Sequence, residues 1–97
     1  MINYKIKNNG DRYELYFNEV LGVITNKIEK LLASLYFFYL EKINSNKDFN
    51  FTIEIKENPI LASNIQNNIH ILEIYYDQYK HQLISIWAGV NIPDWFK

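Results

Sequence analysis

The sequence predicts an α+β domain with a small antiparallel sheet and two long helices, in the order ββαβα. Three observations lead to this class. An Asn-Gly turn separates two alternating segments near the N-terminus, two long stretches carry apolar residues at helical spacing, and a third alternating segment lies between those stretches. A chain of 97 residues is expected to form a single domain over residues 1–97.

The first element is a β-hairpin formed by residues 2–7 and 12–17. Its turn contains Asn9-Gly10, a dipeptide that readily adopts the positive φ angles of tight hairpin turns. In the second segment, apolar Leu15 and Phe17 alternate with polar neighbours, which indicates a strand with one buried face.

A helix is expected to follow over residues 19–44, with Asn18 as its N-cap and Glu19 in its first turn. Gly22 weakens the first turn by up to about 1 kcal/mol, so the start can lie as late as Thr25. The apolar residues that recur at a spacing of three to four are Leu21, Ile24, Ile28, Leu31, Leu35 and Phe38.

Residues 49–56 alternate strictly between apolar and polar side chains and predict a strand. Asn58 and Pro59 then form a helix-start signal, and apolar spacing favours a second helix over residues 59–88. The alternative is a short helix to Asn67 followed by strands 69–76 and 82–87. The residues expected in the core are Leu31, Leu35, Ile53, Ile69, Leu72 and Leu83.

Charge and composition exclude several functions. Ten basic and eleven acidic side chains give a net charge of −1, and no segment is basic enough to follow a nucleic-acid backbone. The densest apolar run, residues 31–40, is half of what a membrane span needs, and the N-terminus alternates like a strand rather than a signal peptide. We expect a cytoplasmic protein that uses no cofactor and binds neither nucleic acid nor a membrane.

One polar stripe on the second helix has metal-ligand chemistry: His70, Glu73, Asp77 and His81. It extends over roughly 16 Å at 1.5 Å per residue, which is too long for one ion. We therefore predict no metal or catalytic role, with solvated ion pairs in its place; a small metal-dependent enzyme built on this stripe is an alternative. No serine lies in a nucleophile motif, so we expect a protein that is not an enzyme.

Sixteen residues are aromatic, eight of them tyrosines, which are enriched where proteins meet. The run from Leu35 to Leu40 has large apolar side chains all around a helix. One interpretation is that the second helix covers the part of this run that the sheet leaves exposed. The other is that Tyr36 or Tyr39 belongs to a docking surface. The C-terminal aromatics close on the core or act as interface anchors: Trp87, Trp95 and Phe96.

The chain is small, free of cysteine, nearly neutral and rich in Tyr, and 51 of its 97 residues are Ile, Asn, Lys, Tyr or Phe, which have A/T-rich codons. In these features it resembles the immunity proteins of bacterial contact-dependent growth inhibition systems. The resemblance covers the whole chain through composition and not through a motif, so it assigns no residue. It implies a cytoplasmic protein that binds a toxin domain, commonly a nuclease, and blocks its active surface.

By exclusion, we expect function to lie in a protein-binding surface on the polar side of the second helix and the adjoining strand. An acidic surface there suits a basic partner. A phage-encoded inhibitor of host defence, such as an anti-CRISPR protein, is an alternative, as is a homo-oligomer formed through residues 35–40. The expected state is a monomer or weak homodimer. The candidate contacts are Glu54, Glu57, Glu73, Tyr75, Asp77 and Gln78.

Overall fold

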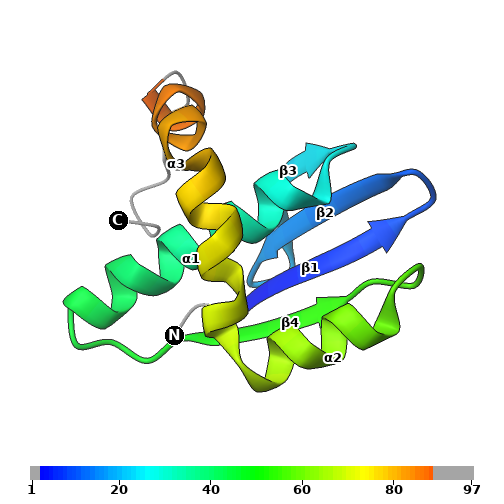
Figure 1. Cartoon of the computed structure of the whole chain (residues 1–97), viewed down its shortest axis with the longest axis horizontal. Coiled ribbons are helices and arrows are strands. Elements are labelled where there is room, and N and C mark those ends of the chain that lie inside the picture. The colour runs from blue at the N-terminus through cyan, green and yellow to red at the C-terminus, as the bar shows by residue number, and fades with distance from the viewer. Residues whose placement is uncertain (1–2, 89–97) are drawn as a thin grey trace.

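The computed structural model describes residues 3–88, with side chains described up to residue 81 (Figure 1). The predicted α+β class is confirmed: a four-stranded mixed sheet packs against three helices. In chain order the elements are β1 (Asn3–Asn9), β2 (Arg12–Phe17), β3 (Val20–Thr25), α1 (Ile28–Asn44), β4 (Asn50–Glu54), α2 (Pro59–Asn67), a 3₁₀ turn η1 (Ile69–Leu72) and α3 (Glu73–Ala88).

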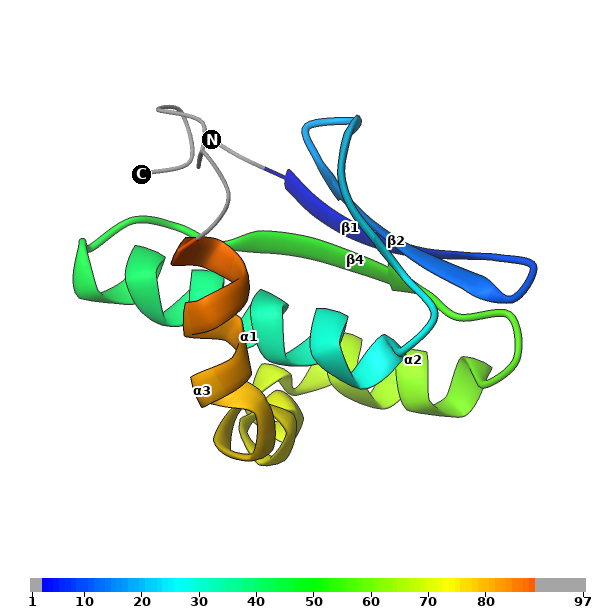
Figure 2. The same cartoon turned by 90° about the horizontal axis from the view of Figure 1, so that it is seen from above.

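The helices lie on one face of the sheet, and α1 is placed between the sheet and α3 (Figure 2). The strand order is β3-β2-β1-β4, so β3 and β4 form the two edges. The opposite face of the sheet carries no helix of residues 3–88 (Figure 2).

The N-terminal hairpin forms as predicted, except that Asn9 belongs to β1, opposite Arg12, and not to the loop. Its loop consists of Gly10 and Asp11, and Gly10 has a φ of +66°, a left-handed conformation that glycine adopts without steric cost. The Asn8 side chain donates hydrogen bonds to the carbonyl oxygens of Gly10 at 2.9 Å and Arg12 at 3.3 Å. These bonds hold the loop closed from its inner side.

The predicted helix start at residue 19 is wrong, because residues 20–25 form the third strand. Asn18 and Glu19 have φ angles of +50° and +69°, and they link β2 to β3 as a two-residue loop. Two positive φ angles are the signature of a type I′ hairpin turn. Asn18 is thus a turn residue and not a helix cap, and its Oδ1 accepts a 2.8 Å hydrogen bond from the backbone N–H of Asn3.

The sheet is mixed where an antiparallel sheet was predicted. Strand β4 pairs with β1 in parallel, with Ile6 opposite Ile53. The reason is the crossover: helix α1 carries the chain under the sheet from the β3 edge to the β4 edge (Figure 1). A crossover through a helix lets the next strand run in the same direction as the strand before the helix, so β4 runs parallel to β3 and to β1.

The predicted helix over residues 59–88 is interrupted at Asn68, and the alternative strands 69–76 and 82–87 do not form. The φ and ψ of Asn68 are −149° and 97°, an extended conformation that ends α2. Its side chain accepts a 3.2 Å hydrogen bond from the N–H of His70 and starts η1. The Asn58–Pro59 start is confirmed, since Asn58 Oδ1 accepts the N–H of Leu61.

The core lies between the sheet and α1, with η1 and α2 closing it. Of the predicted core residues, Leu31, Leu35, Ile53 and Leu72 are buried, Ile69 is half-buried, and the side chain of Leu83 lies outside the described part. The remaining largest buried side chains are Tyr4, Ile6, Leu15, Leu32, Phe38 and Ile65.

Aromatic rings gather around Tyr4 in the middle of the sheet. Its ring centroid lies 5.6 Å from those of Phe17 and Phe38 and 4.7 Å from that of Phe49. Its hydroxyl is buried and has no hydrogen-bond partner among the described residues. Burial raises the pKa of Tyr4 to about 12, because the charged phenolate is poorly solvated there.

Candidate functional site

Four rings from three separate elements meet on the side of α1 that faces away from the sheet. Tyr36 and Tyr39 come from α1, His70 from η1 and Tyr76 from α3, and we refer to these four residues as the aromatic cluster. The Tyr36 ring lies 5.5 Å from Tyr39, 6.4 Å from His70 and 5.6 Å from Tyr76, measured between centroids. Tyr39 and His70 meet edge to face at 5.9 Å.

The interruption of the helix at Asn68 brings the residues of the aromatic cluster together. With α2 ended there and η1 turning the chain, α3 starts in a new direction and packs across α1 (Figure 2). A continuous helix over residues 59–88 would have carried Tyr76 onward along the axis of α2. The interruption therefore turns a regular spacing in sequence into a contact between two helices.

The cluster is buried at its centre and open at its rim. Tyr36 is 6% exposed, Tyr39 and Tyr76 are half-buried, and His70 is exposed. The Tyr36 hydroxyl lies 3.5 Å from His70 Nδ1, at the long end of the range for a hydrogen bond. The rings thus present apolar faces and polar edges together at the surface.

Two carboxylates border the cluster. Glu73 and Asp77 are exposed and lie one turn apart on α3, which places them on the same side of the helix. The pKa of Tyr36 is raised first by burial and then by the negative charges of Glu73 and Asp77, with further contributions from the neighbouring tyrosines. Asp77 also forms a 3.8 Å ion pair with Lys80.

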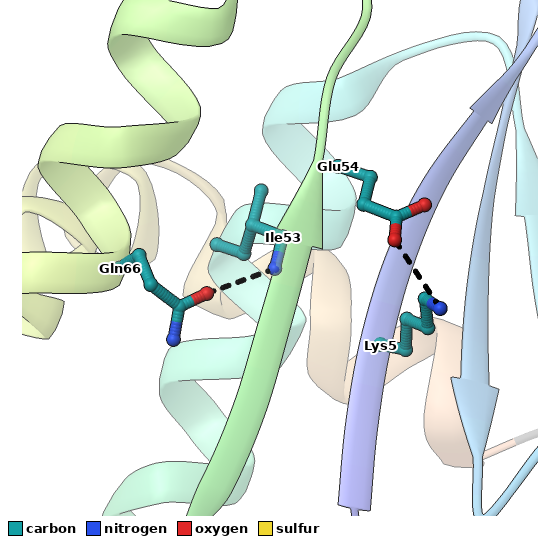
Figure 3. Close-up of polar contacts among 4 residues, drawn as sticks. All are labelled: Lys5, Ile53, Glu54 and Gln66. Atoms are coloured by element: carbon teal, nitrogen blue, oxygen red, sulfur yellow. Dashed lines mark hydrogen bonds and ion pairs between the residues drawn. The ribbon is translucent and has the colours of Figure 1, made fainter.

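The six predicted contact residues fall into separate regions. Glu54 lies on the face of the sheet that the helices leave uncovered, where it forms a 3.3 Å ion pair with Lys5 (Figure 3). Glu57 follows β4 and accepts a 2.6 Å hydrogen bond from the Tyr13 hydroxyl. The other four share one helix, α3: Glu73, Tyr75, Asp77 and Gln78.

The structure thus places Glu54 and α3 on opposite sides of the sheet. In β4, the buried Ile53 and Ile55 face the helices, so the intervening Glu54 points the other way. Sequence spacing alone showed that Glu54 is polar, but it could not show that all three helices pack on the face of the sheet opposite to Glu54.

The histidine stripe is also divided. His70 belongs to η1 and contacts Tyr36 and Tyr39, whereas Glu73, Asp77 and His81 follow along α3. Among the side chains of residues 3–81, no three His, Asp or Glu groups converge in a way that would hold a metal ion.

The run from Leu35 to Leu40 is covered from two directions. The sheet packs on one side of α1, and η1 and α3 pack on another, so Leu35, Tyr36 and Phe38 are buried and the rest of the run is half-buried. Sequence reasoning singled out Tyr36 and Tyr39 but expected one continuous helix over residues 59–88, and so missed the contact of Tyr36 with Tyr76. Trp95 and Phe96 lie outside the described residues, as does the side chain of Trp87.

Comparison of the chain with protein-family models, with curated proteins and with solved structures finds no match. Within residues 3–88, no helix has both the length and the hydrophobicity that crossing a membrane requires.

Proposed function

We propose that the chain is an inhibitor that binds a basic protein partner through the aromatic cluster and its bordering carboxylates. In its specific form, the proposal is an immunity protein that neutralises a toxin domain in the cytoplasm, with a nuclease as the expected toxin. The observation that carries it is the meeting of three tyrosines and a histidine beside Glu73 and Asp77.

This combination of groups suits Arg and Lys side chains. A cation over an aromatic ring gains about 0.5–2 kcal/mol, and nearby carboxylates add charge attraction and steer the approach. Tyr also provides rigid contact area together with a hydroxyl, which is why it is frequent at binding hot spots. A nuclease must bind phosphates, so its active surface is rich in the basic side chains that such a site recognises.

Of the contacts expected from sequence, the proposal keeps those on α3: Glu73, Tyr75, Asp77 and Gln78. Glu54 and Glu57 stand apart from the aromatic cluster, and each is engaged by a side chain of the same molecule, Lys5 and Tyr13 respectively. They therefore supply a matched control for charge.

The test uses the immobilised chain to capture its partner from a lysate of the native host, followed by measurement of association with the purified partner. Glu73→Lys combined with Asp77→Lys is expected to slow association and to weaken binding, most strongly at low salt. Glu54→Lys combined with Glu57→Lys changes the net charge equally and should leave binding close to that of the parent.

The same variants are then compared for protection of cells that express the captured partner. The proposal fails if the α3 double reversal binds as tightly as the parent at low salt, or if the control pair loses binding to the same extent. Equal thermal melting of both double variants excludes a loss caused by unfolding.

A further inference from the structure

The β4 edge of the sheet is closed by a side chain. Gln66, on α2, accepts a 3.1 Å hydrogen bond from the N–H of Ile53 through Oε1 (Figure 3). Its Nε2 donates a 2.8 Å hydrogen bond to the carbonyl of Phe51. A residue of a parallel strand beside Thr52 would use its own C=O and N–H in the same way. The carboxamide of Gln66 therefore takes the place of a neighbouring strand.

The β3 edge has no such closure among the described residues: β3 is the last strand on its side of the sheet (Figure 1). Backbone groups in an antiparallel ladder point alternately toward and away from the partner strand. The pair Phe17–Val20 closes a two-residue loop and Val23 pairs with Leu15, so Val23 turns its backbone groups toward β2. The N–H and C=O of Ile24 consequently point outward.

Apolar side chains accompany this edge. Leu21 lies opposite Tyr16 and Ile24 opposite Glu14, so both point to the face of the sheet that the helices leave uncovered. Leu21 is 43% exposed and Ile24 48% exposed. Charged residues, prolines and β-bulges protect edge strands; Val20–Thr25 has a bulge at Gly22 but neither a charged residue nor a proline.

We propose that β3 pairs in antiparallel fashion with β3 of a second copy of this chain, which joins the two sheets into one. The pairing segment carries no charge, so its two copies meet without like-charge repulsion. Antiparallel pairing places the start of one strand beside the end of the other. Glu19, just before β3, then lies near Lys27 of the second copy, just after it, and the two-fold axis repeats this contact.

Charge complementarity is what favours a second copy as the occupant. Glu19 and Lys27 are both exposed, and neither forms an ion pair within residues 3–81. The bulge at Gly22, where β3 has one residue more than β2, limits the ladder to a few rungs. A contact of this size forms a weak dimer that dissociates on dilution.

The first experiment is sedimentation equilibrium of the full chain from micromolar to millimolar concentration. The parent is expected to form a dimer as concentration rises, and Ile24→Lys should raise the dimer dissociation constant by about tenfold or more. Ile60→Lys is the matched control, because Ile60 is 73% exposed on α2 and far from β3 in the fold. It should dissociate like the parent.

A charge exchange tests the geometry independently of the apolar contact. Glu19→Lys alone and Lys27→Glu alone each place like charges together and should weaken the dimer, whereas the double exchange should restore it. Circular dichroism confirms that each variant is folded. A parent that stays monomeric at millimolar concentration overturns the proposal. So does a dimer that responds to Ile60→Lys rather than to Ile24→Lys, or one in which the double exchange brings no recovery.

Discussion

The two edges of the sheet differ in what lies beyond them, and the difference follows from the order of elements along the chain. After β4, only a short loop precedes α2, which folds back beside the same strand and brings Gln66 to its backbone. After β3, α1 leaves for the opposite edge and runs beneath the sheet (Figure 2). The element that follows an edge strand therefore decides whether that edge is covered.

The side chains near the two edges also differ in how far they are buried. Ile53 of β4 is buried together with Ile65 of α2, while Leu21 and Ile24 of β3 remain exposed. The β4 edge contributes to the core, and the β3 edge contributes mainly surface. This comparison predicts unequal costs for equal substitutions.

The largest expected effect is on the free energy of unfolding, when one isoleucine near each edge is truncated to alanine. Ile65→Ala, at a fully buried position, should lower the free energy of unfolding by about 2–5 kcal/mol. Ile24→Ala, at a half-exposed position, should lower it by less than about 1 kcal/mol. Urea unfolding at micromolar concentration measures both values. Similar losses for the two variants would mean that the β3 edge is as well covered as the β4 edge.

The contrast between the edges was only partly accessible from sequence. Alternation correctly predicted β1, β2 and β4, since each has one buried face. It failed at β3 because Leu21 and Ile24 happen to continue the helical spacing of Ile28 and Leu31. The β-branched residues of 20–25 and the turn propensity of Asn18 were the signals that favoured a strand.

The candidate site was harder to predict for a related reason. The spacing of apolar residues at three to four positions continues from Ile65 to Ile69, on either side of Asn67 and Asn68. Periodicity alone therefore cannot reveal that the helix stops there. The stop is a local competition, in which the Asn68 side chain caps η1 instead of letting the backbone continue α2. Without that turn, the contact of Tyr76 with Tyr36 cannot be inferred.

An intermediate effect is expected from the side chain that closes β4. Gln66→Ala removes two hydrogen bonds to the strand, at 3.1 and 2.8 Å, and should cost about 1–2 kcal/mol in the free energy of unfolding. Hydrogen exchange at the Ile53 amide should accelerate, because its acceptor is lost. Gln78→Ala, an exposed position on α3, is the matched control and should change stability by less than about 0.5 kcal/mol. Unchanged protection of the Ile53 amide in Gln66→Ala would contradict the role given to this carboxamide.

The smallest effect at neutral pH concerns the inner strand β1, where Tyr4 is opposite Phe17 in β2 and Phe51 in β4. Its buried hydroxyl has no partner among the described residues, so Tyr4→Phe should raise the free energy of unfolding by about 1 kcal/mol at pH 7. The native pKa of Tyr4 is raised from 10.0 to about 12, and the unfolded chain therefore releases this proton first. The parent is expected to lose stability as the pH rises from 10 toward 12, and Tyr4→Phe should lack that component of the loss.

Urea unfolding of the parent and of Tyr4→Phe across this pH range gives the comparison, in which the other tyrosines contribute equally to both proteins. Parallel stability curves for the two would show that the Tyr4 hydroxyl is solvated in the native state. A loss of stability in Tyr4→Phe at pH 7 would show that the hydroxyl has a partner there. The first outcome would mean that water reaches the centre of the sheet.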